Sequence, residues 1–207
     1  MNREPSTALR RIGLLGGSFD PIHSAHLQLA HSACAELALD AVWFIPAGQP
    51  WQRDPLAASP QQRWDMVKLA IAGLHGLRAC DIELKRDGPS YTIDTVRELR
   101  ATYPETAFTF ILGADQLRNL PTWNGWSEIV AQVDLAAARR PGYADSAPPE
   151  LLVTLAAHGH QLHRLEMAEI DLSATRVRER IALGQPLAGL VPAAVAHYID
   201  QHRLYQH

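Results

Sequence analysis

Short apolar runs alternate with helical patterns along this chain, and this alternation constrains the fold more than any other feature. Six runs have the length and composition of β-strands, at 11–17, 41–47, 77–84, 107–113, 134–140 and 162–172. Six helical patterns separate or follow them, at 26–39, 59–74, 92–103, 126–133, 173–184 and 192–202. The alternation predicts a parallel sheet covered by helices on both faces. We therefore expect a doubly wound, Rossmann-like α/β fold with additional C-terminal helices.

Length and composition fit a single domain. The chain has 207 residues, of which 47% are hydrophobic, enough for a central sheet to bury a sizeable core. We expect one domain over 1–207, with 1–9 as a flexible tail and a C-terminal helical part from about 172 to 207. The stretch 141–149 is rich in proline and glycine and is expected to be a surface loop.

Charge and cysteine content exclude several classes of protein. The formal net charge of −3 argues against wholesale binding of nucleic acid. Cys34 and Cys80 are far apart, so they indicate neither a disulfide framework nor a cysteine zinc site. An apolar run at 12–15 is broken by Gly16-Gly17, too early for a secretory signal, and no stretch has the length of a membrane span. We expect a cytoplasmic protein without nucleic-acid or membrane partners, and the sequence leaves a homo-oligomer open.

Three unusual loops follow predicted strands, at 16–23, 45–53 and 113–123. Ligands of doubly wound sheets bind at the carboxyl ends of the strands, where these loops should lie. The first loop opens the stretch "GGSFDPIHSAHL", whose two glycines let the backbone turn sharply and approach a ligand. It matches neither GxGxxG nor GxxxxGK[ST]. The N-terminus of the following helix nevertheless favours phosphate.

His23 and His26 lie one helical turn apart, just beyond this glycine turn. Two histidines at this spacing are compatible with zinc, but neither a third ligand nor an HExxH motif accompanies them. A lone histidine would most often be a surface residue. The neighbouring glycine turn favours contact with phosphate charge in a transition state. These residues alone leave metal site, phosphate site and plain turn open.

Other candidate residues also have an ordinary structural interpretation. For Ser173 the residues alone favour a helix cap, whereas for Asp115 a helix cap and a functional role are equally favoured. Trp123 lies in a loop, where a tryptophan either plugs a gap or stacks on a flat heterocycle. Arg140 ends a predicted strand, where anions would bind. The histidines of "HGHQLH" at 158–163 are expected on the surface.

Two segments together resemble a known superfamily. "GGSFDPIHSAHL" is similar to the GxFDPxHxGH signature of HxGH-motif nucleotidyltransferases, and "LSATRVR" at 172–178 resembles their second signature. Within this superfamily the chain most resembles the bacterial nicotinate-nucleotide adenylyltransferase family, through "KRDGPSYTIDT", "ILGADQLRNLPTW", "ARRPGY" and "YIDQHRLY". It departs from the pattern at Ala25, which replaces the glycine of HxGH, and at 49–53, where Gln52 replaces a histidine and Arg53 keeps a positive charge.

The resemblance implies an adenylyltransferase of NAD biosynthesis. AMP would pass from ATP to the 5′-phosphate of nicotinic acid mononucleotide, giving nicotinic acid adenine dinucleotide and pyrophosphate, with Mg²⁺ carried by the ATP phosphates. The implied catalytic residues are His23, His26 and Arg178. The implied ATP-binding residues are Gly16, Gly17, Ser18, Phe19, Gly113, Asp115, Ser173 and Thr175. The implied substrate-binding residues are Thr92, Trp123, Asn124, Arg140 and Arg53, and no protein residue is implied as a metal ligand.

Alternative functions remain open at this point. A related transferase could adenylylate nicotinamide mononucleotide or phosphopantetheine instead. A nucleotide-binding sensor without turnover would share the fold, and the departures at Ala25 and 49–53 are compatible with it. The intact His23, His26 and Arg178 weigh against the sensor.

Overall fold

A computed structural model of the chain describes residues 10–50, 56–138, 147–166 and 172–206. Within these ranges six parallel strands form one sheet in the order β3-β2-β1-β4-β5-β6. The strands are β1 Arg11–Gly17, β2 Ala41–Pro46, β3 Leu77–Ala79, β4 Ala107–Leu112, β5 Asp134–Ala138 and β6 Leu162–Leu165. This order, with the first strand central and the chain winding outward on both sides, confirms the predicted doubly wound Rossmann-like fold.

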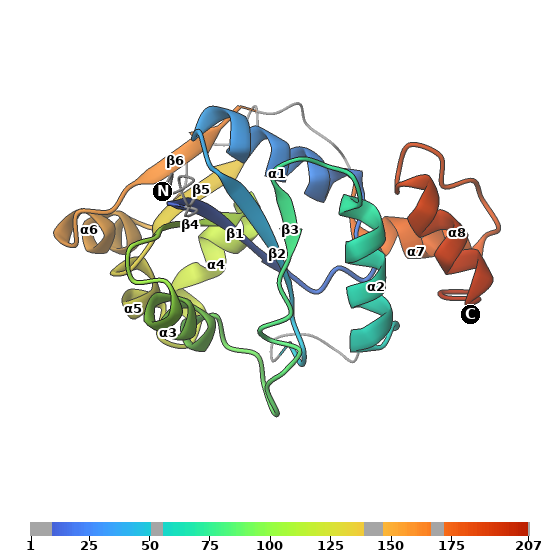
Figure 1. The fold of residues 1–207 in the computed structure, drawn as a ribbon, viewed down its shortest axis with the longest axis horizontal. Helices are drawn as coiled ribbons and strands as arrows, with labels where there is room; N and C mark the ends of the chain where they lie inside the picture. The colour runs from blue at the N-terminus through green and yellow to red at the C-terminus, as the bar shows by residue number, and fades with distance from the viewer. Residues whose placement is uncertain (1–9, 51–55, 139–146, 167–171, 207) are drawn as a thin grey trace, which may run out of the picture.

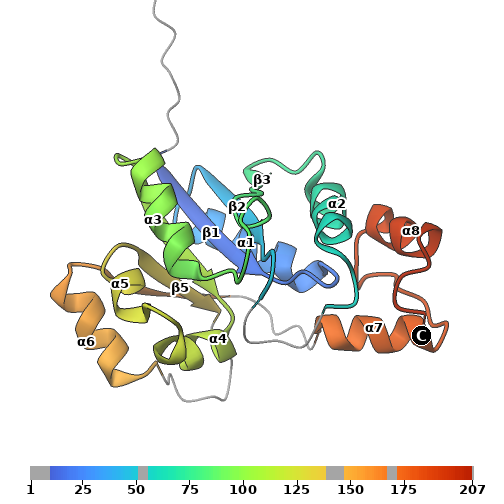
Figure 2. The same cartoon turned by 90° about the horizontal axis from the view of Figure 1, so that it is seen from below.

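Helices cover both faces of the sheet (Figures 1 and 2). One face carries α1 Ser24–Glu36 and α2 Pro60–Ile71, and α7 Ala174–Ala182 and α8 Ala193–Gln201 extend the same apolar core beyond α2. The other carries α3 Thr92–Thr102, α4 Ala114–Asn119, the 3₁₀ turn η1 Leu120–Thr122, α5 Trp126–Val130 and α6 Pro149–Ala157. Alternate strand residues feed the two apolar cores: Leu15 and Val42 face the first, whereas Leu14 and Trp43 face the second.

Several elements differ from the sequence-based prediction, among them β6, which was expected over 162–172 but ends at Leu165, and α4, which lies within a predicted loop. The strand expected over 77–84 ends at Ala79, because the N–H of Leu84 donates to the carbonyl of Asp81 (2.9 Å) and closes a turn that buries Glu83. Helix α6 was not predicted; its Val153 and Thr154 are β-branched and weaken the helical signal. The tail expected at 1–9 lies outside the described residues.

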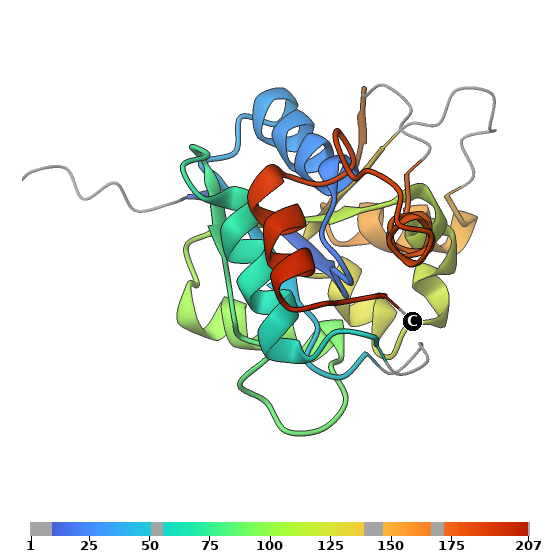
Figure 3. The ribbon, with the colours of Figure 1, turned by 90° about the vertical axis from the view of Figure 1, so that its right-hand side faces the viewer.

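The C-terminal helices lie beside α2 and the start of α1 (Figure 3). The hydroxyl of Tyr198 on α8 donates to Asp65 on α2 (3.3 Å). Ser24, the first residue of α1, donates its N–H to the carbonyl of Leu190 (2.8 Å) and its hydroxyl to that of Gly189 (2.9 Å). The C-terminal segment therefore buttresses the helix that begins after the first loop. No described helix is both long and apolar enough to cross a membrane.

Candidate active site

The candidate site lies where the sheet reverses its winding direction, between β1 and its neighbours. Pairing between β1 and β2 continues to Gly17–Pro46, whereas pairing between β1 and β4 ends at Leu14–Phe110. The ends of β1 and β4 therefore separate at the carboxyl edge of the sheet. This is the place at which doubly wound sheets bind ligands. The described parts of the three unusual loops all lie at this edge, as predicted.

The two histidines of the first loop are in direct contact. His23 is the N-cap of α1, and its backbone N–H donates to Nδ1 of His26 (3.2 Å). The rings stack with their centroids 3.7 Å apart. Because Nδ1 of His26 accepts this bond, the proton of its neutral ring belongs on Nε2.

His23 is kept neutral by its surroundings. Only 5% of the residue is exposed, and this burial lowers the pKa of its imidazole to about 4. At neutral pH the ring is uncharged and offers one N–H donor. Its Nδ1 is buried and has no hydrogen-bond partner among the described residues. A buried polar atom without a protein partner is rare in a folded interior and leaves a hydrogen bond for a bound molecule or water to make.

Phe19 supports this pair from the core. Its ring is buried, lies edge-on to His26 at 5.0 Å between centroids, and contacts Phe44 at 5.7 Å. Its backbone has a positive φ of 49°, which turns the chain sharply. A Cβ on Gly17 would lie 3.2 Å from the Phe19 ring, so a larger residue would crowd it. The backbone of Phe19, rather than its side chain, is the part available to a ligand.

The side chain of Asp20 holds the same loop in place. Its buried carboxylate accepts hydrogen bonds from the N–H groups of Ala57 (2.9 Å) and Ala58 (3.1 Å) and from the hydroxyl of Tyr205 (2.7 Å). These donors come from the segment before α2 and from the end of the chain. The loop is therefore fixed by three groups that are distant from it in sequence.

Arg178 on α7 reaches the first loop across 158 positions of sequence. Its Nη1 donates to the carbonyl of Asp20 (2.7 Å), and its Nη2 donates to the hydroxyl of Thr175 (3.3 Å). Ser173 caps α7 by accepting the N–H of Arg176 (3.2 Å), which confirms the predicted helix cap. The two segments that resemble nucleotidyltransferase signatures thus meet at Asp20.

Residues implied for the second substrate also lie together. Gly125 has a φ of +65°, and a Cβ there would lie 3.1 Å from the side chain of Ile93. The loop that carries Trp123 and the exposed Asn124 is therefore packed against the first turn of α3, which begins at Thr92. Trp123 is half-buried and lies edge-on to Phe110, with centroids 6.1 Å apart.

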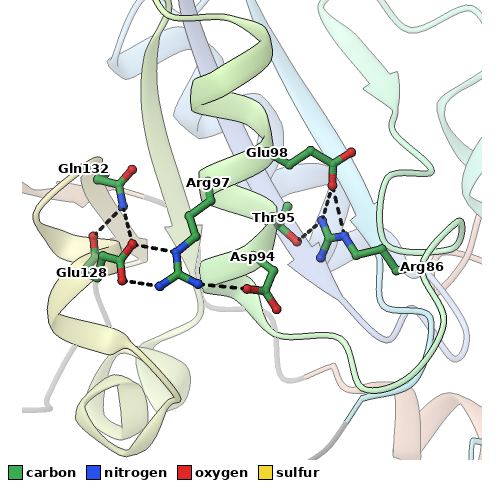
Figure 4. A network of polar contacts seen from close by, with 7 residues as sticks. All are labelled: Arg86, Asp94, Thr95, Arg97, Glu98, Glu128 and Gln132. Carbon is green, nitrogen blue, oxygen red and sulfur yellow. Dashed lines mark hydrogen bonds and ion pairs between the residues drawn. The ribbon is translucent and has the colours of Figure 1, made fainter.

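A polar network holds α3 against α5 behind this loop (Figure 4). The guanidinium of Arg97 donates to both oxygens of Glu128 (2.7 and 2.6 Å) and to Asp94 (3.2 Å). Arg86 donates to Glu98 (3.1 Å) on the other side of α3. These pairs are largely exposed, so each stabilises the arrangement only modestly.

Of the remaining sequence-based candidates, Gly113 and Asp115 lie at the start of α4, and two arginines lie outside the described residues. Gly113 is the N-cap of α4 at the end of β4, so of the two interpretations of Asp115 the helix cap is wrong, and Asp115 pairs with Arg118 in the first turn. A Cβ on Gly113 would meet no other atom within 4 Å, so space remains beside its backbone. Arg53 and Arg140 lie outside the described residues.

Sequence reasoning missed several buried polar residues of the site. Arg63 donates to the carbonyls of Ser18 and Gly48, and Ser90 accepts the N–H of Gly48 (3.0 Å). Arg63 lies in register with the buried Met66 and Val67 of α2, and an arginine on an apolar helix face was a readable signal. No local pattern could reveal the contact of Tyr205 with Asp20, because these residues are 185 positions apart.

No protein metal site is evident among the residues that the structure describes, where His, Cys, Asp and Glu form no group of three suited to a metal ion. The histidines after α6 lie at the opposite edge of the sheet, beside the start of β5. Asp134 lies 3.0 Å from Nδ1 of His160 and 3.7 Å from Nε2 of His163. These contacts are remote from the candidate site.

Comparisons with known proteins agree with this geometry. The family model described as "Cytidylyltransferase-like" matches residues 14–180. A protein of Bordetella petrii named "Probable nicotinate-nucleotide adenylyltransferase" is 52% identical over 198 residues, 96% of this chain and 100% of the relative. A protein of the same name from Dehalococcoides mccartyi is 46% identical over 94% of this chain and 97% of its own.

A solved structure shares the fold at much lower sequence identity. Nicotinic acid mononucleotide adenylyltransferase of Plasmodium falciparum, complexed with NaAD, superposes with a TM-score of 0.79 at 16% identity, over 95% of this chain and 97% of the other. Since the family model spans both signature segments and the bacterial relatives match almost end to end, the chain belongs to the cytidylyltransferase-like family and, within it, to the nicotinate-nucleotide adenylyltransferases.

Proposed function

We propose that this chain transfers AMP from ATP to the 5′-phosphate of nicotinic acid mononucleotide. A phosphate oxygen of the mononucleotide forms a bond to the α-phosphorus of ATP, and the bond from that phosphorus to the bridging oxygen of the β-phosphate breaks. The products are nicotinic acid adenine dinucleotide and pyrophosphate. Mg²⁺ enters as part of the substrate, bound to the ATP phosphates. The reaction would supply the dinucleotide precursor in NAD biosynthesis.

The hydrogen bond from Arg178 to the carbonyl of Asp20 is the observation that carries this proposal. It brings a guanidinium from α7 to the loop that ends in the stacked pair of His23 and His26. A planar guanidinium binds two phosphate oxygens at once, and imidazole N–H groups donate hydrogen bonds to a third. Together these donors suit a triphosphate whose negative charge shifts during reaction.

The chemistry needs positioning and charge stabilisation rather than a general base. The attacking phosphate is already an anion, so no proton has to be removed. His26, through Nε2–H, and His23 would stabilise charge on the α-phosphate, and Arg178 would stabilise the departing pyrophosphate. The backbone of 16–19, the cap of α7 at Ser173 with Thr175, and Gly113 with Asp115 would hold the rest of ATP.

The second half of the site would select the acceptor. Trp123 would stack on the pyridine ring, while N–H groups near Thr92 and Asn124 would receive its carboxylate. Arg53 and Arg140 would contribute positive charge for the acceptor phosphate. We place this activity in the cytoplasm, with the two nucleotides as its partners.

One assay tests the proposal. Pyrophosphate release from ATP and Mg²⁺ is measured with nicotinic acid mononucleotide, nicotinamide mononucleotide and phosphopantetheine in separate reactions. We expect release with the nicotinic acid substrate at the highest kcat/KM. Release only with one of the other two acceptors would overturn the substrate assignment, and release with none would instead indicate a nucleotide-binding sensor.

A further inference from the structure

Arg63 is a buried cation that the chemistry described above does not use. It lies in the first turn of α2, and only 1% of the residue is exposed. Its Nη1 donates to the carbonyl of Ser18 (2.7 Å), and its Nη2 donates to the carbonyl of Gly48 (3.1 Å). One rigid guanidinium therefore joins the loop after β1 to the loop after β2.

Burial of this charge costs free energy, so the presence of an arginine at this buried position needs an explanation. Desolvation lowers the pKa of the guanidinium, and the nearby carboxylate of Asp20 opposes that shift. The hydrogen bonds recorded for Arg63 end on backbone carbonyls, and its Nε has no partner among the described residues. An apolar side chain at this position would avoid the desolvation cost. An apolar side chain could not, however, donate hydrogen bonds to the carbonyls of two separate loops.

Both loops are closely packed and hydrogen-bonded where Arg63 contacts them. A Cβ on Gly48 would lie only 2.6 Å from the carbonyl oxygen of Glu83, so this loop is packed directly against the neighbouring backbone. The N–H of Gly48 is bound by Ser90 at 3.0 Å. On the other side, Ser18 is followed by the buried Phe19 and by the anchored carboxylate of Asp20. Because each loop is closely packed, the two hydrogen bonds of Arg63 set the distance between the loops.

We propose that Arg63 is a positioning residue that fixes the spacing between the ATP-binding loop after β1 and the acceptor-side loop after β2. The inference rests on the proposed function, in which the two loops hold the two reacting nucleotides. In-line transfer requires the attacking oxygen and the α-phosphorus to be held close and aligned. A misplacement of about 1 Å can lower the rate by about 10²-fold even when each substrate still binds.

The sheet itself offers a competing explanation. The N–H of Ala47 donates to the carbonyl of Gly17 (2.9 Å), so the two loops are also joined by one backbone hydrogen bond. If that bond alone set the spacing, Arg63 would contribute only stability. The two explanations differ in what they predict for turnover at saturating substrate.

Arg100 provides a matched control at the opposite edge of the sheet. Its guanidinium also bridges two backbone carbonyls, those of Gln132 (3.1 Å from Nε) and Thr106 (2.8 Å from Nη1). These carbonyls precede β5 and β4, whereas the candidate site lies where the strands end. Arg63→Lys and Arg100→Lys each keep the charge and lose the planar fork that reaches two acceptors.

The test compares kcat and both KM values of the wild type and the two variants, together with their melting temperatures. We expect Arg63→Lys to lower kcat by about 10- to 100-fold, with each KM changed less than about threefold. Arg100→Lys should keep kcat within about twofold of the wild type even where its melting temperature falls. If Arg63→Lys melts below the assay temperature, Arg63→Gln measured at a lower temperature replaces it, with the same kcat loss expected.

Wild-type kcat in the Arg63 variant, or an equal loss in both variants, would overturn the inference and leave the backbone bond of Ala47 as the determinant of spacing. A loss confined to one KM would also overturn it. Failure of the proposed function is a separate result, visible in the wild type. If the wild type prefers another phosphorylated acceptor, the same comparison is run with that acceptor, and a wild type active on none of them overturns both.

Discussion

The two halves of the candidate site are built differently. In the half around the first loop the supporting residues are buried and hydrogen-bonded: His23, Asp20 and Arg63 are exposed by 5%, 2% and 1%, whereas His26 and Arg178 beside them are half-buried. The half around α3 and α4 is open, with a half-buried Trp123 and an exposed Asn124. The supports of the first half are buried bonds from distant segments, whereas the second half is backed by exposed ion pairs such as Arg97–Glu128.

This difference indicates a division of labour. Donors that are held in place by buried supports need little reorganisation when charge develops, so we expect them to act on the transition state. An open aromatic face and loop N–H groups suit recognition of a substrate that must enter and leave. We therefore expect changes in the first half to affect kcat and changes in the second half to affect KM.

The largest effect should follow removal of His26, which we propose to face the phosphates of ATP. His26→Ala should lower kcat by about 10²- to 10³-fold with little change in ATP affinity, because its Nε2–H acts on charge in the transition state. Steady-state kinetics and ATP titration measure both quantities. His31→Ala, an exposed histidine on the same helix, is the control and should keep full activity. A His26→Ala enzyme with normal turnover would remove the catalytic role.

Protonation of His23 should appear in protein stability. Its pKa is lowered from 6.5 to about 4 by burial, so between those values the unfolded chain binds more protons than the folded one. The free energy of unfolding should be level above about pH 6.5 and fall as the pH drops toward 4, by roughly 3 kcal/mol at most. His23→Gln should lose this slope in urea titrations, whereas His31→Gln should retain it. A slope unchanged by His23→Gln would contradict the burial account.

Loss of the proposed stacking face should weaken acceptor binding. Trp123→Ala should raise the KM for nicotinic acid mononucleotide roughly tenfold, the effect of about 1.4 kcal/mol, with kcat nearly unchanged. Trp64→Ala on α2 serves as the control and should leave this KM unaltered. A fall in kcat without a change in KM would mean that Trp123 belongs functionally to the first half.

The smallest effect is expected at Ala25, where the family signature has glycine. Ala25 lies in the first turn of α1 and is half-buried, so a methyl group is accommodated there. Ala25→Gly should lower the free energy of unfolding by about 0.5–1 kcal/mol or less, through backbone entropy, and leave kcat within about twofold. A large gain in kcat on restoring glycine would show that Ala25 obstructs ATP.

Local patterns predict the sheet and the placement of the candidate site residues at its carboxyl edge, but not the contacts that hold them there. Alternation of strand and helix predicted six parallel strands, and the spacing of His23 and His26 predicted that the two rings share the start of one helix. The supports of Asp20 could not be predicted in this way, because Tyr205 and Arg178 reach it across more than 150 positions. The turn that buries Glu83 likewise overrides the alternating pattern that predicted a longer β3.

The division of labour is tested most directly by a paired measurement. His26→Ala and Trp123→Ala are assayed side by side for kcat and for the KM of nicotinic acid mononucleotide. The account predicts that the histidine variant loses turnover at unchanged KM, whereas the tryptophan variant keeps turnover at raised KM. Equal changes of kcat and KM in both variants would contradict it and mean that the two halves act as one unit.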